Sequence, residues 1–366
     1  MIYTPERDKI WKQIEEANIY YIYGAQVVAY GVYAAIKEVL GKYPEAFLVS
    51  SMANNPLKIE HIPVIEINGN IDSNALIIVA TPEIYHEEIK DKLQHFNLNN
   101  ILFVDSHNEY LIMSRYFQQL GRFKLLEDFP LHNKSENKLP DVKMYMAKHH
   151  LDRKLKGKYY IPSWVIPIQV GAALTELRIA ELTDNTGDNI SYKNYKYSEL
   201  TAMYWAWKNS SEEYQGICHY RRILLLDEDD LRKIKQNNIN VVLPLPFVCY
   251  PDASGQYSRY IAIDDQKKMM QALKEVSPQY YMEALKILKE PYLYNYNMFL
   301  ADSHTFNDYC EWIFPILERA EELCEPEGLE RKDRYIGYMA EVLTAIYFLC
   351  NKYNLNIVHG EKKWMI

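Results

Sequence analysis

The run Ala75-Leu76-Ile77-Ile78-Val79-Ala80, followed directly by Thr81-Pro82-Glu83, decides the fold of the first part of this chain. Its almost continuous apolar character is typical of a strand that is buried on both faces, as in a parallel sheet. Thr81 suits the N-cap of a helix and Pro82 suits its first position. The spacing therefore predicts a buried strand that leads straight into a helix.

The same alternation of strand and helix surrounds this run. Segments rich in β-formers at 18–23, 46–50 and 100–105 predict three further strands, and residues 27–40 predict a helix. This βαβ pattern predicts a Rossmann-like parallel sheet domain over residues 1–131 and an α/β fold class for the chain.

The turn after the first strand, Gly24-Ala25-Gln26-Val27-Val28-Ala29, stands where dinucleotide-binding proteins carry their glycine-rich loop. Gln26 replaces the glycine that would let a pyrophosphate approach the backbone. Ser50 and Ser51 stand where an acidic residue would follow the second strand. We expect a structural turn here, so NAD is not expected as a cofactor. A dinucleotide-dependent N-terminal domain stays an open alternative.

A polar segment at 132–141 has no apolar periodicity and contains Pro140, which is typical of a linker. A new strand at 142–147 then begins a second α/β domain, which we expect to extend over residues 142–366.

The composition excludes several classes of protein. The formal net charge of −8 makes nucleic acid an unsuitable partner. The five Cys form no CxxC pair, which favours reduced thiols in the cytoplasm. Residues 1–7 lack the features of a signal peptide, and no apolar run approaches the ~20 residues that span a bilayer. We therefore expect a cytoplasmic protein.

The most informative candidate site is the run Tyr214-Gln215-Gly216-Ile217-Cys218-His219-Tyr220-Arg221-Arg222. An apolar strand ends here in His219 and two adjacent Arg, and strand ends are where α/β sheets bind ligands. Alternation can relax at a strand end, so both Arg can reach one cavity. Adjacent guanidinium groups repel unless an anion lies between them, and a diphosphate is the natural candidate. A surface ion-pair cluster with Asp227 or Glu228 is the alternative.

Two earlier clusters combine small and short polar residues, at 166–173 and 184–194. Small residues allow a ligand or another part of the backbone to come close, and short polar side chains suit either a ribose or a plain loop. The candidates that they supply are Gln169, Gly171, Asp188, Asn189 and Asn194.

Two further candidates lie towards the C-terminus. Asn297 belongs to an apolar strand at 294–301, and Glu341 lies between apolar helical turns. An unpaired acid in such a place is expensive to bury, so Glu341 is either paired with an Arg or part of a site.

These clusters, in this order, resemble a bacterial glycosyltransferase family from capsule, exopolysaccharide and lipopolysaccharide gene clusters, long catalogued as a domain of unknown function. The resemblance covers residues 141–350 and leaves out the N-terminal domain. The matching segments lie at 142–148, 166–173, 187–191, 193–194, 197–209, 216–222, 296–299, 309–312 and 337–341. It implies a GT-A-like fold that binds nucleoside-diphosphate sugars.

The chain departs from the family pattern at two places. Family members usually place a His after the Gln-Tyr segment, where this chain has Gln256-Tyr257-Ser258-Arg259-Tyr260. They also tend to carry Glu-Arg-Leu where this chain has Glu341-Val342-Leu343. A non-catalytic protein of the same pathway, which binds a nucleotide sugar or acts as a scaffold, is therefore the alternative function.

The resemblance implies transfer of a hexose, in pyranose or furanose form, from a nucleoside-diphosphate sugar to a glycan or a lipid-linked acceptor. A UDP-linked donor is the first expectation. Because no Asp-x-Asp follows the strand, we expect Arg221 and Arg222 to bind the diphosphate in place of a metal; Mn²⁺ or Mg²⁺ is the alternative. The acidic run 227–230 predicts a solvated helix start.

Within this scheme His219 orients a phosphate or a sugar hydroxyl, and Glu341 is the catalytic base. The predicted donor-binding residues are Gln169, Gly171, Asp188, Asn189, Asn194, Arg221, Arg222 and Asn297. A lipid-linked acceptor would bring the protein into peripheral contact with the inner face of the membrane.

Overall fold

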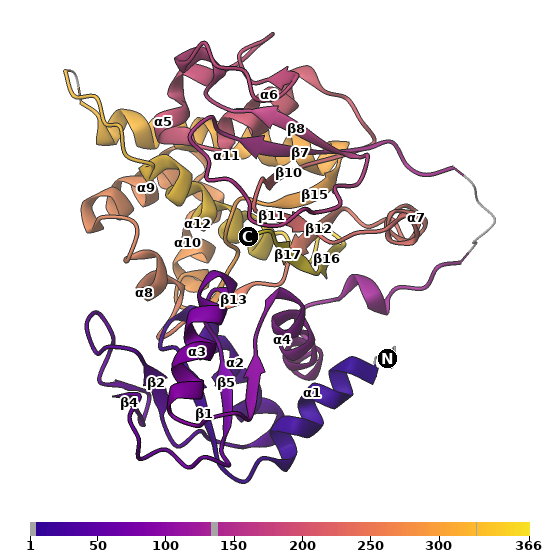
Figure 1. The fold of residues 1–366 in the computed structure, drawn as a ribbon. Helices are drawn as coiled ribbons and strands as arrows, with labels where there is room; N and C mark the ends of the chain where they lie inside the picture. The colour runs from indigo at the N-terminus through magenta and orange to yellow at the C-terminus, as the bar shows by residue number, and fades with distance from the viewer. Residues whose placement is uncertain (1–4, 133–137, 327) are drawn as a thin grey trace.

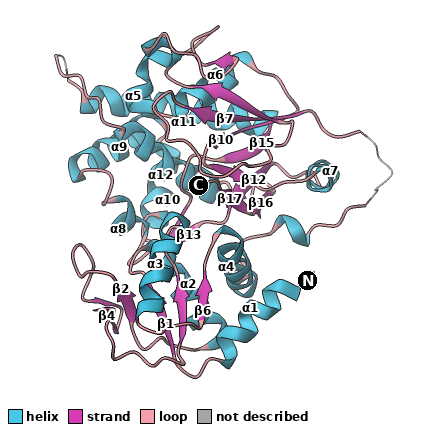
Figure 2. Ribbon diagram, viewed as in Figure 1, coloured by secondary structure: helices cyan, strands magenta, loops and turns pink. Residues whose placement is uncertain are grey.

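The computed structural model describes residues 5–132, 138–326 and 328–366. It has a mixed α/β fold with two parallel-rich sheets, so the predicted fold class is confirmed (Figures 1 and 2). Most of the predicted linker, residues 133–137, lies outside the described residues, and the proposed domain boundaries stay predictions.

The first part of the chain builds the lower half of Figure 1. Its elements are α1 (Pro5–Glu16), β1 (Tyr20–Tyr23), α2 (Val27–Leu40), β2 (Phe47–Val49), β3 (Lys58–Ile59), β4 (Ile62–Glu66), β5 (Leu76–Val79), the 3-10 turn η1 (Glu83–Tyr85), α3 (His86–His95), β6 (Ile101–Phe103), α4 (Ser106–Leu120) and the 3-10 turn η2 (Leu126–Asp128).

These strands form one sheet of order β3-β4-β2-β1-β5-β6, in which all neighbours except β3 and β4 are parallel. All four residues of β5 are buried, as the apolar run at 75–80 predicts. The chain leaves β1 for β2 on one side and returns to β5 on the other. The gap between β1 and β5 is therefore the topological switch point, where ligands bind in such sheets.

The start of the helix after β5 differs from the prediction. Thr81 does not act as an N-cap, because its Oγ1 has no hydrogen-bond partner among the described residues. The chain first forms η1, and α3 begins only at His86. Helix α2, by contrast, has the predicted bounds.

The second part of the chain builds the upper half of Figure 1. Its elements are β7 (Val142–Lys148), β8 (Val165–Gln169), the 3-10 turn η3 (Ala172–Leu174), β9 (Leu182–Thr183), the 3-10 turn η4 (Ser191–Lys193), α5 (Asn194–Tyr197), α6 (Leu200–Asn209), β10 (Tyr214–His219), β11 (Arg222–Leu224), α7 (Glu228–Gln236), β12 (Val241–Pro244), β13 (Phe247–Val248), α8 (Ala253–Tyr257), α9 (Ile263–Val276), α10 (Pro278–Ile287), β14 (Tyr292–Leu293), β15 (Phe299–Asp302), α11 (Ser303–Cys324), α12 (Tyr335–Cys350), β16 (Ile357–Gly360) and β17 (Lys362–Trp364).

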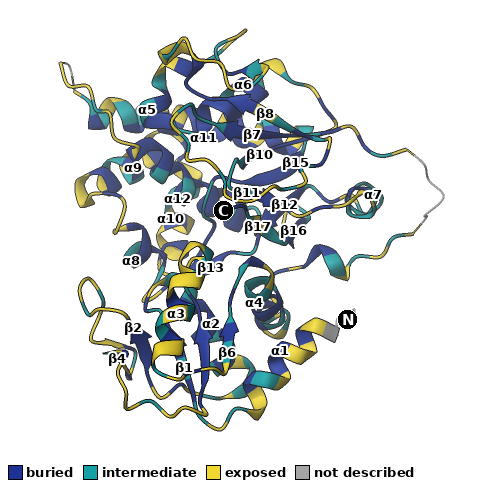
Figure 3. Ribbon diagram, viewed as in Figure 1, coloured by how far each residue is buried: buried dark blue, intermediate teal, exposed yellow. Residues whose placement is uncertain are grey.

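The main sheet of this part has the order β16-β12-β15-β10-β7-β8-β9, with β11 and β17 attached beside β10. Strands β10, β7, β8 and β9 are mutually parallel, whereas β15 runs antiparallel to its neighbours. The central strands are buried (Figure 3). The carboxyl ends of β7, β8 and β10 therefore meet at one edge.

The two parts pack closely against each other. One apolar core cluster runs through both, and the rings of Phe117 from α4 and Tyr292 from β14 lie 5.9 Å apart across the boundary. Arg122 pairs with Glu290 at 2.6 Å, and Lys362 of β17 pairs with Glu109 of α4 at 2.8 Å. These contacts hold the carboxyl edges of the two sheets in a fixed position towards each other.

Candidate active site at the junction of the two sheets

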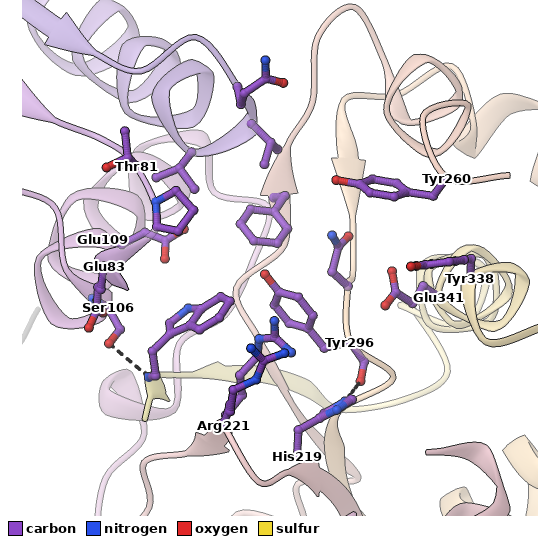
Figure 4. A pocket seen from close by; sticks show the side chains of 18 of the residues that line it. Thr81, Glu83, Ser106, Glu109, His219, Arg221, Tyr260, Tyr296, Tyr338 and Glu341 are labelled. Atoms are coloured by element: carbon purple, nitrogen blue, oxygen red, sulfur yellow. Dashed lines mark hydrogen bonds between the residues drawn. The ribbon is translucent and has the colours of Figure 1, made fainter. Parts of the chain in front are cut away.

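A cavity of about 640 Å³ lies where the carboxyl edges of the two sheets face each other. One wall follows β1, β5 and β6, and the other follows β7, β8 and β10 and includes the start of α12. Figure 4 shows Thr81, Glu83, Ser106 and Glu109 on the first wall, and His219, Arg221, Tyr260, Tyr296, Tyr338 and Glu341 on the second.

A tight hairpin brings the predicted His and Arg residues to this cavity. His219 ends β10 and pairs with Arg222, the first residue of the antiparallel strand β11. Tyr220 and Arg221 form the turn between them, and all four residues line the cavity. The prediction of a relaxed end on a single strand is corrected, because a reversal of the chain brings both Arg to the cavity.

The guanidinium group of Arg222 lies between two aromatic rings, 4.1 Å from the ring centre of Tyr296 and 4.0 Å from that of Trp364. These cation–π contacts fix the side chain without neutralising its charge. Burial, and to a smaller degree the charge of Arg221, lowers the pKa of Arg222. The positive charges of Arg221 and Arg222 therefore repel each other, and a bound anion would offset this repulsion.

Both arginines keep hydrogen-bonding capacity that the described residues leave unused. The Nε atoms of Arg221 and Arg222 are buried and have no hydrogen-bond partner among the described residues. The two acids that the ion-pair alternative invokes are engaged elsewhere: Asp227 caps α7, and Glu228 pairs with Arg232 at 3.0 Å. This geometry favours the anion-binding interpretation.

The backbone of Tyr296 connects the two predicted catalytic residues. Its carbonyl accepts a hydrogen bond from Nε2 of His219, and its N–H donates one to Glu341. Tyr296 and Asn297 both have positive φ values, 79° and 47°, which are costly for residues other than glycine. The structure holds this strained loop in place between β10 and α12.

Glu341 has the electrostatic properties of a general acid or base. Burial raises its pKa to about 8, and the negative charge of Glu199 adds to this effect. Arg222 and Arg334 act in the opposite direction but do not outweigh burial. A carboxyl group with a pKa near neutrality can accept and release a proton at the working pH of an enzyme.

Glu199 is the buried partner that the sequence did not identify. Its carboxylate accepts a hydrogen bond from Asn297 at 2.8 Å and pairs with Arg334 at 3.4 Å. Burial opposes ionisation of Glu199, but the charge of Arg334 and the hydrogen bond from Asn297 favour it, and the pKa of Glu199 is lowered. Burial lowers the pKa of His219, so the imidazole is neutral and its Nδ1 is left as an acceptor. The site thus has one ionised carboxylate, Glu199, beside one protonated carboxyl, Glu341.

The raised pKa of Glu341 predicts a pH-dependent effect on stability. Between about pH 4.5 and pH 8 the folded protein holds a proton on Glu341 that the unfolded chain has released, so this group makes the free energy of unfolding fall as the pH rises. In Glu341→Gln this fall in the free energy of unfolding should disappear. Urea unfolding should show that the free energy of unfolding of the variant, relative to that of the wild type, is higher at pH 8 than at pH 5 by up to a few kcal/mol. An equal difference between the two proteins at both pH values would contradict the shift.

The structure places three predicted donor-binding residues, Gln169, Gly171 and Asn194, outside the cavity lining. The amide of Gln169 is buried and bonds the backbone of Leu177 and Ile179 at 2.8 and 2.9 Å. Gly171 has φ +65°, and a Cβ there would come within 2.8 Å of Asn194. Gln169, Gly171 and Asn194 instead build the loops around the buried carboxylate of Asp184, whose Oδ2 accepts a hydrogen bond from the Gly171 N–H at 2.8 Å.

Three more predicted donor-binding residues also lie outside the cavity lining. Asp188 is exposed and accepts a hydrogen bond from Tyr204 at 3.3 Å, and Asn189 bonds within its own loop. Asn297 is buried and donates to Glu199 and to the carbonyl of Gly337. Its amide supports the strained loop and Glu199, which is a positioning role.

Several cavity residues were not identified from the sequence. They are His149 and Asp152 after β7, Glu199 before α6, Tyr260 after α8, Tyr296 before β15, Arg334 and Tyr338 at the start of α12, and Trp364 in β17. Arg259, at the first departure from the family pattern, also lines the cavity, and its guanidinium donates to Gln26 of the first part.

The part of the chain that the structure describes contains no group of three or more His, Cys, Asp or Glu side chains that could hold a metal ion. The acidic run at 227–230 begins α7, where Asp227 and Asp230 form a capping box, as the predicted helix start requires. All five Cys are free. Over residues 5–132, 138–326 and 328–366, no helix has both the length and the apolar character to cross a bilayer.

Comparison with known proteins finds one solved structure and one family model that are similar to this chain. The apo structure of the bifunctional glycosyltransferase WbbM matches with a TM-score of 0.52 and 27% sequence identity, over 62% of this chain. The chain corresponds to 45% of the length of that structure. The search among curated proteins found no match. The model of the family described as "Domain of unknown function (DUF4422)" matches residues 143–352, which hold the hairpin of His219 and the start of α12. The chain therefore belongs to the DUF4422 family.

Proposed function

We propose that this protein transfers a hexose from a nucleoside-diphosphate sugar, with UDP-linked donors first, to a glycan or lipid-linked acceptor. The observation that carries the proposal is the pair Arg221 and Arg222, which face a cavity at a sheet edge with unused buried donors. The similarity to a solved glycosyltransferase supports a role in glycosyl transfer.

Diphosphate departure is the step that Arg221 and Arg222 would assist. As the bond between the anomeric carbon and the phosphate oxygen breaks, negative charge grows on the leaving diphosphate. Two guanidinium groups can each donate two hydrogen bonds to phosphate oxygens, and the cation–π contacts with Tyr296 and Trp364 hold the side chain of Arg222 in position. In this scheme no metal is needed, and Mn²⁺ or Mg²⁺ is the alternative.

Glu341 would remove the proton of the attacking acceptor hydroxyl. In an inverting transfer a base must lie opposite the leaving group, and Glu341 lines the same cavity with a pKa near neutrality. His219 would orient a sugar hydroxyl, which can donate to Nδ1, because its Nε2 already donates to the Tyr296 carbonyl.

The wider setting of the reaction follows from the family resemblance. A GT-A-like enzyme of bacterial capsular, exopolysaccharide or lipopolysaccharide synthesis would act in the cytoplasm. It would touch the inner face of the membrane where its acceptor is lipid-linked. The two departures from the family pattern favour a second candidate, a non-catalytic protein that binds the nucleotide sugar.

Donor binding is the first test. In buffer with EDTA, a panel of UDP-, GDP-, dTDP- and CMP-sugars should contain at least one donor that raises the melting temperature by several degrees. The physical reason is that a ligand at about 100 times its Kd adds about 2.7 kcal/mol of stability. Arg221→Ala should remove the shift, and Arg232→Ala, on the far helix α7, should keep it.

Hydrolysis or transfer of the stabilising donor separates the two candidates. Turnover in EDTA supports the transferase with an arginine pair, and binding without turnover supports the non-catalytic protein. Strict dependence on Mn²⁺ would overturn the metal-free scheme. Absence of any shift, with and without Mn²⁺, would overturn nucleotide-sugar binding altogether.

A further inference from the structure

The wall of the cavity that the first part of the chain provides has no function in the scheme above. It consists of the segments that follow β1, β5 and β6, and its lining includes Glu83, Tyr85, Asp105, Ser106 and Glu109. We infer that this wall is the acceptor subsite and that it binds a neutral saccharide. The inference rests on the proposed function and deepens it.

The position of the wall in its own sheet supports a binding role. The segments at 24–28 and 80–83 follow β1 and β5, so they flank the topological switch point of the first sheet. At such a point two loops diverge and leave a crevice at the carboxyl edge. Here the crevice opens onto the cavity of the second sheet, so a ligand bound in it lies beside the hairpin of Arg221 (Figure 4).

The basic side chains are confined to one wall of the cavity, which also includes the acids Asp152, Glu199 and Glu341. Among the described residues, the basic ones that line the cavity all belong to the second part of the chain, namely His149, His219, Arg221, Arg222, Arg259 and Arg334. Within residues 5–132, the lining of the first wall includes no Lys, Arg or His, and its charged residues are the acids Glu83, Asp105 and Glu109. An anionic diphosphate therefore favours the second wall, and an uncharged occupant suits the first.

The acids of the first wall are satisfied by the chain itself. Glu83 accepts from the Ser106 N–H, Asp105 accepts from Asn108 at 2.8 Å, and Glu109 pairs with Lys362 at 2.8 Å. They therefore need no cation, but they keep lone pairs for sugar hydroxyls.

Aromatic side chains line the cavity on both walls. Tyr85 of η1 is 52% exposed, and Tyr260 is 55% exposed and stacks on Tyr338 with ring centres 5.5 Å apart. Exposed tyrosines in a cavity present apolar faces for the C–H faces of a sugar and hydroxyls for its rim. This pattern fits a saccharide better than a lipid tail, which would need a deeper apolar groove.

Tyr85 and its neighbour Ile84 provide a matched test. Ile84 is 46% exposed on the same turn but does not line the cavity. The probes are methyl α- and β-glucoside, galactoside and mannoside, observed by saturation-transfer NMR with saturating UDP present to fill the donor half. At least one hexoside should bind, and Tyr85→Ala should weaken it on the order of tenfold, as expected for the loss of one stacking contact. Ile84→Ala should leave it unchanged, and Tyr85→Trp should restore it.

The outcomes separate this inference from the proposed function. Binding that depends on Tyr85 supports the subsite whether or not a nucleotide sugar is hydrolysed, and a lack of hydrolysis counts against the transferase alone. The subsite is overturned when no hexoside binds, when Ile84→Ala is as harmful as Tyr85→Ala, or when Tyr85→Trp fails to restore binding in a protein of unchanged melting temperature.

Discussion

Replacement of Arg222 by Ala is expected to lower kcat/KM for the nucleotide sugar by about 10²–10³-fold, the usual cost of losing one donor that stabilises developing charge. The side chain lies between Tyr296 and Trp364 and faces the cavity with an unpaired buried Nε. Its charge is therefore held at the site before the donor binds. The guanidinium group is then already in position to stabilise the charge of the leaving diphosphate. Steady-state kinetics with the donor found by thermal shift measure the effect.

Two further variants show whether geometry or charge carries this effect. Arg222→Lys keeps the charge but loses the planar fork, so it should recover only part of the lost activity. Arg232→Ala removes an arginine that pairs with Glu228 and Asp229 on α7, and it should leave kcat/KM unchanged. If Arg222→Ala retains wild-type kcat/KM and the wild-type melting temperature, the arginine pair does not bind the diphosphate.

The fold could be predicted from the sequence because its signals are local. The apolar run at 75–80 and the helix at 27–40 appear in the structure within a residue or so of their predicted bounds. Thr81 shows where local signals fail. Its position suits a cap, but the chain turns through η1 at the edge of the cavity, and the cap hydrogen bond does not form.

The candidate site could be predicted only in part. His219, Arg221, Arg222 and Glu341 were visible because each places charge beside an apolar element, where the cost of burial suggests a function. Asn194 fits the donor hypothesis because short polar side chains suit a ribose, and Gln169 fits it because its small neighbours would let a ligand come close. The same side chains serve equally well in the hydrogen bonds of buried loops, as around Asp184 here.

Other site residues act through neighbours that are distant in the sequence. Glu199 matters because it lies beside His219, Arg334 and Glu341, and Trp364 matters because its ring makes a cation–π contact with Arg222. Neither has a local signal at its own position. Arg259, at a departure from the family pattern, contacts Gln26 of the other part of the chain. Only the packing of the two sheets brings these groups together.

Replacement of Glu341 by Gln is expected to reduce kcat by about 10²–10⁴-fold, the contribution of a positioned base, while the donor still binds. Because the base must be ionised and its pKa is about 8, wild-type kcat/KM should rise with pH and level off above that value. This rise, the acid limb of the pH–rate profile, should be absent in Glu341→Gln. It should persist in Glu311→Gln, a substitution on the exposed side of α11.

The neighbouring carboxylate, Glu199, provides a second test of Glu341 as the catalytic base. The charge of Glu199 helps to raise the pKa of Glu341, so Glu199→Gln should move the limb of the pH–rate profile to lower pH, whereas Glu341→Gln removes it. A limb that survives in Glu341→Gln, or that stays in place in Glu199→Gln, would show that another group takes the proton. The paired shift and loss would identify Glu341 as the base, because only a group that senses Glu199 and carries the proton itself responds to both substitutions.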